Sequence, residues 1–365
     1  MTWHKRLFGL LLILLPTQLG LHFWPEWSMV LGRRIDYLSP TVYLTDIIIV
    51  SILSFWFLRS RPKFNPRIPF LVLLLAALNI WVSQNQPVAI YKWLKVLEFG
   101  MLGWYIVKTK PSTSFVIWNL SFGILFSSLL AIGQFLFQRS IGGPLRLLGE
   151  RTFNGDTPGI ARVVLGGREI IRSYATFPHP NVLGGFLAIT LPLVLRLKRT
   201  MWFYVVMVCG IAALILTFSR SAWVVSMLGA VWTFIHPENV LAFIPGTMSF
   251  AEESIVVRQE LNASALSLWQ QSPLVGVGLG NFLVNLPQIL SSRQIYFLQP
   301  VHNIFLLILA ETGIIGLLLF AYLLWKARSP MVFMIVLLGL VDHYPLTLQQ
   351  GQLLLTLVLG LGLVK

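Results

Sequence analysis

The sequence has 365 residues, of which 56% are hydrophobic and 11% are charged, and its mean hydropathy is +0.78. Because soluble domains carry about a quarter charged residues, this composition excludes a separate soluble domain and predicts an all-α polytopic membrane protein. The formal net charge of +14 comes from short basic clusters between apolar runs. That distribution indicates a lipid bilayer rather than nucleic acid as the partner.

Apolar runs of near-bilayer length predict transmembrane helices along the whole chain. They lie at about 7–23, 41–58, 68–83, 88–107, 113–137, 178–195, 201–217, 220–235, 301–325, 330–344 and 350–364. Basic residues in alternate short connections place those connections and both termini in the cytoplasm. The basic connections fall on the cytoplasmic side throughout only if the weaker run 240–250, which contains Pro245 and Gly246, also crosses the membrane. This gives about 12 transmembrane helices in a single integral membrane domain, residues 1–365.

Three charged residues lie at helical spacing within the predicted span 88–107: Lys92, Lys95 and Glu98. Lys95 and Glu98 are three residues apart and can pair on one helix face. That pairing leaves Lys92 near the outer membrane face, where it is a candidate for lining a substrate site. The alternative is a purely internal pairing of these charges.

The first long outer loop, residues 138–177, has an excess of arginine over acidic residues. Its basic residues are Arg139, Arg146, Arg151, Arg162, Arg168 and Arg172, against Glu150, Asp156 and Glu169. A planar guanidinium matches two phosphate oxygens, so these arginines are candidates for binding a phosphate-bearing lipid. Arg172 is the strongest candidate because it directly precedes the return into the membrane. The alternative is a solvated loop that contacts lipid headgroups.

The chain returns to the membrane at His179-Pro180-Asn181. Proline suits the first helical turn because its missing N–H would have no partner there. We expect Gly184 and Gly185 to allow close helix contact, and Asn181 to offer its amide to a sugar or a phosphate. His179 is a second candidate for lining the site, although a structural role is favoured.

Arg220 lies between two apolar runs that are separated by almost no loop. An arginine near membrane depth is costly, so its side chain should face a partner or a wet cavity. With Ser219 and Ser221 beside it, an anionic ligand is the predicted partner. The alternative is that Arg220 reaches the outer lipid headgroups.

The second long outer loop, residues 251–300, begins with a predicted amphipathic helix that contains Arg258. The apolar face of this helix consists of Leu261, Ala265, Leu268 and Trp269. Arg258 would lie near a ligand at headgroup level, or else form a solvated pair with Glu252 or Glu253. The following Gly276, Gly278 and Gly280 lack the third glycine of a dinucleotide-binding GxGxxG loop, so they predict a glycine-rich turn.

His302 and Asn303 begin the apolar stretch VHNIFLLILAETGIIGLLLF. An imidazole at a helix mouth can take a proton from a hydroxyl near neutral pH, which makes His302 the candidate general base. Asn303 is a candidate for lining the same site. The alternative is that both residues only cap a membrane helix.

Asp342 belongs to the polar sequence Asp342-His343-Tyr344-Pro345 at a predicted outer helix end, followed by several glutamines. Such a cluster is unusual at membrane depth, so Asp342 is a further candidate for lining a cavity. The sequence contains no HExxH, Cys/His cluster, P-loop or DxD pair. We therefore expect neither a metal site nor a cofactor.

Four stretches together resemble the O-antigen ligase and O-antigen polymerase superfamily. In chain order they are RSYATFPHPNVLGGFLA, LTFSRSAWV, Arg258 with Trp269 and PLVGVGLGNF, and HNIFLLILAETGIIGLL. His302 and Gly313, with ten residues between them, match the histidine–glycine signature of that family. Arg220 matches its membrane arginine. The specific similarity covers about residues 172–320.

This resemblance implies a bacterial cytoplasmic-membrane glycosyltransferase of the GT-C-like helical type, acting at the outer face. Its donor would be a glycan on undecaprenyl diphosphate, and its acceptor a hydroxyl of a lipid, a glycan or a protein. His302 would be the catalytic base, and Arg172, Arg220 and Arg258 would bind the donor diphosphate without a metal. O-antigen ligase, O-antigen polymerase and protein O-oligosaccharyltransferase all remain open. A flippase for the same lipid-linked glycan is the alternative from another class.

Overall fold

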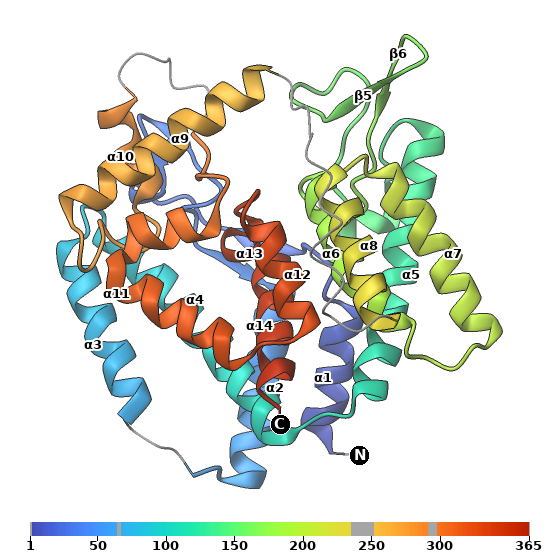
Figure 1. Cartoon of the computed structure of the whole chain (residues 1–365), viewed down its shortest axis with the longest axis horizontal. Helices are drawn as coiled ribbons and strands as arrows, with labels where there is room; N and C mark the ends of the chain where they lie inside the picture. Colours follow the sequence, from blue (N-terminus) through green and yellow to red (C-terminus); the bar gives the residue numbers. More distant parts are fainter. Residues whose placement is uncertain (1, 64–66, 235–251, 291–297, 365) are drawn as a thin grey trace.

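The computed structural model describes residues 2–63, 67–234, 252–290 and 298–364 (Figure 1). Most of them are helical. The long helices are α1 (Trp3–Ile13), α2 (Leu44–Ser60), α3 (Arg67–Val82), α4 (Gln86–Thr109), α5 (Thr113–Phe137), α6 (Pro180–Val194), α7 (Met201–Leu216), α8 (Arg220–Phe234), α9 (Glu252–Gln271), α11 (Ile304–Lys326), α12 (Pro330–Gly339) and α14 (Gln349–Leu363). Short helices are α10 (Phe282–Ile289), α13 (Tyr344–Thr347) and the 3-10 turns η1 (Glu26–Ser28) and η2 (Gly143–Leu148).

The strands form three small antiparallel ladders in the segments between helices. The pairs are β1 (Gly20–His22) with β4 (Thr41–Tyr43), β2 (Met29–Val30) with β3 (Arg33–Arg34), and β5 (Arg162–Leu165) with β6 (Arg168–Ile171). The sequence did not predict any of them. For β5–β6 the sequence does contain a local signal: Gly166 and Gly167 have φ of 55° and 79°, as a two-residue hairpin turn requires, and the strands on either side contain β-branched residues.

The predicted apolar runs coincide with helices, with three qualifications. In the run 330–344, helix α12 ends at Gly339 and the next helix, α13, begins only at Tyr344. The run 7–23 is helical only to Ile13, because Pro16 cannot continue the helix and residues 20–22 pair as a strand instead. The run 240–250 lies outside the described residues. Within the described residues, α5 and α11 are long and apolar enough to cross a membrane, and α6, α7, α12 and α14 are shorter apolar helices.

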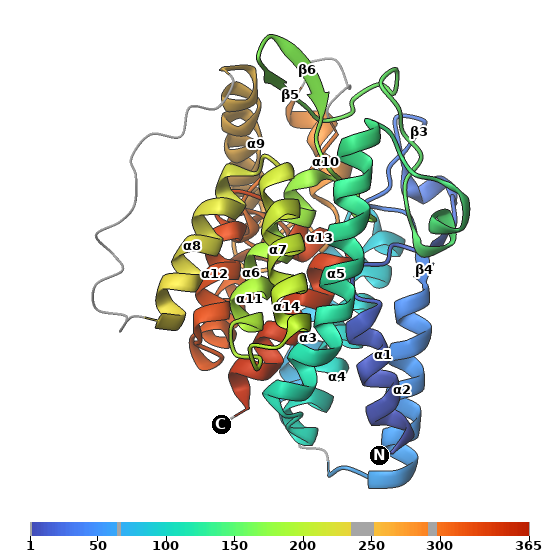
Figure 2. The same cartoon turned by 90° about the vertical axis from the view of Figure 1, so that its right-hand side faces the viewer.

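The two ends of the molecule differ in character (Figure 1, Figure 2). One end, hereafter the α9 end, carries α9, α10 and the β5–β6 hairpin, and the other, the terminal end, carries both chain termini. Helix α9 covers the segment predicted as an amphipathic helix; Leu261, Ala265 and Leu268 of its predicted apolar face are buried and Trp269 is half-buried. Leu261, Ala265 and Leu268 pack with residues of α10 and α11 into a small hydrophobic cluster at the α9 end.

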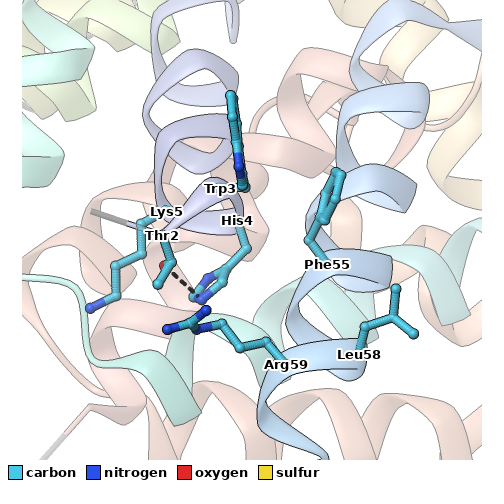
Figure 3. Close-up of a pocket in the computed structure, with 7 residues that line it drawn as sticks. All are labelled: Thr2, Trp3, His4, Lys5, Phe55, Leu58 and Arg59. Carbon is cyan, nitrogen blue, oxygen red and sulfur yellow. Dashed lines mark hydrogen bonds between the residues drawn. The ribbon is translucent and has the colours of Figure 1, made fainter.

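A surface cavity of about 710 Å³ opens at the terminal end, between α1 and α2 (Figure 3). It is lined by Thr2, Trp3, His4, Lys5, Phe55, Leu58 and Arg59. Its lining residues come from the segments 2–5 and 55–59 and include none of the predicted site residues, so the cavity is separate from the site described below.

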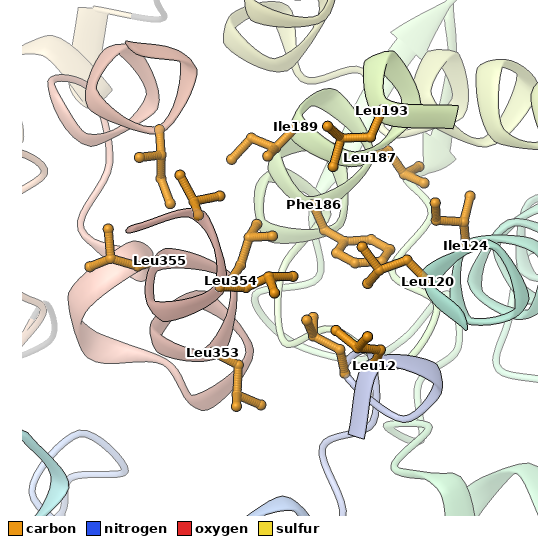
Figure 4. Close-up of a cluster of buried hydrophobic side chains, with 14 of the residues drawn as sticks. Leu12, Leu120, Ile124, Phe186, Leu187, Ile189, Leu193, Leu353, Leu354 and Leu355 are labelled. Carbon is orange, nitrogen blue, oxygen red and sulfur yellow. The ribbon is translucent and has the colours of Figure 1, made fainter. Parts of the chain in front are cut away.

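The main hydrophobic core surrounds α6, whose residues are buried apart from Asn181 (Figure 4). Side chains from α1, α5 and α14 converge on it, among them Leu12, Leu120 and Leu354. The predicted close contact at the paired glycines is confirmed. A Cβ on Gly185 would lie 1.6 Å from the Tyr344 hydroxyl, and one on Gly184 would lie 3.0 Å from the Cβ of Ala222. The close packing fixes the start of α6 against α8 and α13.

Candidate active site

His302 lies immediately before α11, and its neighbour Asn303 caps that helix. The Asn303 Oδ1 accepts hydrogen bonds from the backbone N–H groups of Phe305 (2.9 Å) and Leu306 (3.1 Å). Its Nδ2 donates to the carbonyl oxygen of Leu340 at 3.3 Å. The buried Nδ1 of His302 has no hydrogen-bond partner among the described residues. Capping therefore accounts for Asn303 and leaves the imidazole of His302 available for another role.

A second imidazole, that of His343, packs against His302. The two rings meet edge to face with centroids 5.1 Å apart. His343 is itself fixed, because its Nδ1 lies 2.7 Å from the Thr347 hydroxyl and its ring packs edge to face on Tyr37 at 5.5 Å. Sequence reasoning named His343 only as part of the polar sequence around Asp342, and it did not name Tyr37. Nothing local identifies Tyr37, which is contributed by the segment between β3 and β4.

The carboxylate of Asp342 is the anionic centre of this group. Burial raises its pKa, but attraction to His343, His302 and His179 and the backbone N–H of His343 (2.8 Å) outweigh that effect and lower the pKa below its usual value. Burial lowers the pKa of His179 and of His343 to about 4. At neutral pH the site therefore holds an anionic carboxylate among neutral imidazoles.

The pKa of His302 is also lowered, mainly by burial and further by the positive charge of Arg258, while Asp342 opposes the shift. A neutral imidazole beside a carboxylate can accept a proton, and the carboxylate then stabilises the imidazolium that forms. We name His179, His302, Asp342 and His343 together the histidine cluster.

Arg258 reaches the histidine cluster from α9. Its guanidinium donates to the carbonyl oxygen of Val341 at 2.7 Å, and it attracts Asp342 electrostatically. Asn303 bonds the preceding carbonyl, that of Leu340. These two contacts hold α9 and the start of α11 against the segment that presents Asp342.

Arg172 joins the site from the other side, after β6. Its Nε donates to the Thr217 carbonyl oxygen and its terminal nitrogen to the Asn181 Oδ1, each at 2.7 Å. The backbone N–H of Asn181 donates to the His179 Nδ1 at 3.2 Å, so His179 caps α6 as the favoured structural interpretation predicted. His179 also interacts electrostatically with Asp342 and His302, which places it in the same group.

The remaining candidates lie at different distances from this group. Arg220 is the first residue of α8, is exposed, and follows Thr217, the residue that Arg172 binds, by three positions. Lys92 lies in a different neighbourhood. It packs against Gly280 and interacts with Glu311, nine residues beyond His302 on α11. The structure thus brings Arg172, Arg258, Asn181 and Asn303 to the histidine cluster. Arg220 is near Thr217 in the sequence, and Thr217 is a contact of Arg172.

The glycine-rich turn fixes a break in α11. Gly313 has φ 66° and ψ −168°, and a Cβ there would lie 2.3 Å from the Leu274 carbonyl group. At this break the Gly278 N–H donates to the Glu311 carbonyl oxygen (3.0 Å) and the Ile314 N–H donates to the Pro273 carbonyl oxygen (2.9 Å). The positive φ values of Gly276, Gly278 and Gly280 allow the turn to enter so closely. The spacing between His302 and Gly313 thus sets the position of the α11 start relative to a fixed break.

Fold and site together define a helical protein whose α9 end gathers imidazoles, a carboxylate and guanidinium groups. Residues 185–321 match the family model described as O-antigen ligase, which confirms the predicted resemblance to the O-antigen ligase superfamily over this segment. No curated protein matches the chain. Arg220, Arg258, His302 and Gly313 lie within the matched segment, whereas Asp342 and Arg172 lie outside it and join the site only through the fold. The family supports a role in O-antigen-type polysaccharide biosynthesis and a membrane location.

Proposed function

We propose that this protein is a glycosyltransferase that moves a glycan from undecaprenyl diphosphate to an acceptor hydroxyl at the outer face of the bacterial cytoplasmic membrane. The observation that carries the proposal is the buried Nδ1 of His302, which has no partner among the described residues and lies in the field of Asp342. The family match supplies the class of reaction.

In the proposed reaction the acceptor hydroxyl oxygen attacks the anomeric carbon of the donor glycan. His302 takes the hydroxyl proton, the new glycosidic bond forms, and the bond from the anomeric carbon to the phosphate oxygen breaks. Asp342 stabilises the resulting imidazolium. The electron pair of the broken bond leaves with the lipid diphosphate, so the step balances with the donor and the acceptor alone and needs no oxidant.

The leaving diphosphate needs positive charge as the glycosidic bond breaks. Arg258 and Arg172 reach the site from opposite sides, through bonds to the Val341 and Thr217 carbonyls. Arg220, at the start of α8, is the third guanidinium proposed to bind the donor. Each can present two N–H groups to phosphate oxygens.

We propose a multi-pass topology with both termini in the cytoplasm and the α9 end outside. The apolar helices and the family support membrane insertion. The terminal end carries exposed basic residues, Lys5, Arg6 and Arg59, which the positive-inside rule assigns to the cytoplasm. The histidine cluster then lies at the outer face, where both lipid-linked glycan and acceptor are accessible.

The decisive experiment is transfer by the purified protein in proteoliposomes that contain undecaprenyl-diphosphate-linked glycan. Candidate acceptors are lipid A core, free glycan and a hydroxyl-bearing protein, each supplied separately. Transfer to one of them, lost in His302→Ala, is the expected result and identifies the acceptor. Movement of the donor between leaflets without transfer to any acceptor would instead establish a flippase and overturn the proposal.

A further inference from the structure

The cavity at the terminal end has no role in the proposed transfer, because it is at the other end of the molecule from the histidine cluster (Figure 1, Figure 3). Its volume of about 710 Å³ is within the range of small-molecule sites. Basic and apolar side chains both line it, and none of its seven lining residues is acidic. A site of this composition suits an amphipathic anion.

The polar floor of the cavity is held rigidly. His4 is 5% exposed, and its two ring nitrogens lie 2.8 Å from the Thr2 hydroxyl and 3.0 Å from the Tyr105 hydroxyl. The Tyr105 ring also packs edge to face on His4 and Trp56, which ties the floor to α4 and α2. In Figure 3 the guanidinium of Arg59 lies beside His4 and Thr2. Polar groups of α1 and α2 therefore converge on one point.

The positive charge at this point is not neutralised by protein carboxylates. Arg59 and Lys5 are exposed, and within residues 2–63, 67–234, 252–290 and 298–364 neither forms an ion pair. A guanidinium and an ammonium on either side of a polar floor are suited to a phosphodiester, since Arg59 can bind two of its oxygens.

The other wall of the cavity is apolar and open to the exterior. Trp3 is 64% exposed, Phe55 is 46% exposed and Leu58 is 78% exposed. In the proposed topology these side chains face the acyl region next to the cytoplasmic headgroups, where tryptophan is enriched. A free phosphate would use only the basic part of the site, whereas a phospholipid would use both parts.

We propose that the cavity between α1 and α2 binds one anionic glycerophospholipid of the cytoplasmic leaflet. Its phosphodiester contacts Arg59 and Lys5 at the polar floor, and its acyl chains lie along Trp3, Phe55 and Leu58. The proposal rests on the topology proposed above and is independent of the transfer reaction. Such a lipid would contact both α1 and α2 and stabilise their packing at the end where the two helices meet the membrane surface.

The test is native mass spectrometry of the purified protein titrated with phosphatidylglycerol or phosphatidylcholine. We expect one phosphatidylglycerol to be retained, and the double variant Lys5→Gln/Arg59→Gln to weaken its binding by about 10- to 30-fold, as loss of two charges near a membrane surface predicts. The matched control Lys198→Gln/Arg199→Gln removes two charges between α6 and α7 and should bind phosphatidylglycerol like the parent protein. Leu58→Gln, which keeps the charge, should also weaken binding.

Three outcomes would overturn the lipid site. They are equal retention of both lipids, equal loss in the control variant, and displacement of phosphatidylglycerol by inorganic phosphate, which would indicate a simple anion site. Thermal unfolding of each variant shows whether it remains folded. Transfer activity is measured on the same preparations, so that a parent protein that retains the lipid but transfers no glycan would refute the proposed function alone.

Discussion

The molecule contains two clusters of buried polar groups whose charged side chains have different kinds of partner. One lies between α2, α4 and α14, and the other is the histidine cluster. In the first, hereafter the Lys95 cluster, the Lys95 Nζ lies 2.6 Å from Asp46 and 3.0 Å from Glu98. The Gln349 side chain donates to the Thr45 hydroxyl at 2.9 Å and also to Asp46. Lys95 is 7% exposed, so its charge is enclosed by groups of the same chain.

The histidine cluster leaves proton-accepting capacity open. His302 keeps a nitrogen without a described partner, and the neighbouring Arg172 bonds the neutral oxygens of Thr217 and Asn181.

The Lys95 cluster also has buried oxygens without a partner among the described residues, Glu98 Oε1 and Gln349 Oε1, but they belong to side chains already bound to Lys95 and Asp46. An ion-pair network of this kind mainly holds packed helices together. We therefore propose a structural role for the Lys95 cluster and a catalytic role for the histidine cluster.

The largest expected effect is on transfer in His302→Ala. Loss of the base should reduce transfer by roughly 10²–10⁴-fold, the usual contribution of acid–base catalysis. Donor binding and thermal unfolding should stay near those of the parent, because Asn303 caps α11 without help from His302. Transfer and donor binding are measured on one folded preparation. Near-normal transfer would remove His302 from the mechanism and leave only the arginines.

Lys95→Met should lower stability and leave transfer nearly unchanged, which is the opposite of the result expected for His302→Ala. Removing the cation leaves Asp46 and Glu98 buried without their partner, which typically costs about 3–5 kcal/mol of stability. Unfolding of the variant should therefore occur at lower temperature, while transfer per folded molecule stays close to normal. The triple variant Lys95→Met/Asp46→Asn/Glu98→Gln, which removes all three charges, should recover part of the loss. A stable Lys95→Met with reduced transfer would break the comparison, since it would give the Lys95 cluster a catalytic role.

How far the sequence predicts the two clusters depends on the separation of their members along the chain. The pairing of Lys95 with Glu98 was predicted from helical spacing and is confirmed. Asp46 and Gln349 were not identified as its partners, because they come from α2 and α14 and meet Lys95 only through the fold. Sequence spacing can predict contacts within one helix, but contacts between helices depend on the packing of the whole chain.

The histidine cluster shows the same limit. The sequence motifs identified Arg172, Arg258, His302 and Asp342 separately, because each is a polar group at the edge of an apolar run. They gave no sign that His343 and Tyr37 pack behind His302, since an aromatic contact has no sequence spacing. Lys92, predicted for the same site, instead lies beside Gly280.

The third prediction is that Arg220→Lys reduces both glycan transfer and donor binding. If Arg220 binds the donor diphosphate through a planar fork, lysine keeps the charge but loses the second phosphate contact. Transfer should fall by roughly 10²–10³-fold, as for loss of one transition-state donor, and donor binding should weaken as well. Arg199→Lys, at the connection before α7, is the matched control and should behave like the parent. Normal donor affinity and turnover in folded Arg220→Lys would refute the diphosphate role.

The smallest effect, a shift in pH dependence, tests whether Asp342 acts on His302. The neutral imidazole is the active form, so transfer should fall as pH drops through the pKa of His302. Burial lowers that pKa below 6.5, and the acid limb of the profile should therefore lie below pH 6.5. Asp342 opposes the lowering, because its negative charge favours the protonated ring.

Asp342→Asn should consequently move the acid limb to still lower pH, while the imidazole becomes a weaker base and the maximal rate falls. Asp156→Asn removes one negative charge from an exposed turn in the 138–177 loop and should leave the limb in place. The measurement is the transfer rate as a function of pH for the three proteins. A limb that stays fixed in Asp342→Asn, or moves to higher pH, would show that the carboxylate does not act on His302. The proposed stabilisation of the His302 imidazolium by Asp342 would then be refuted.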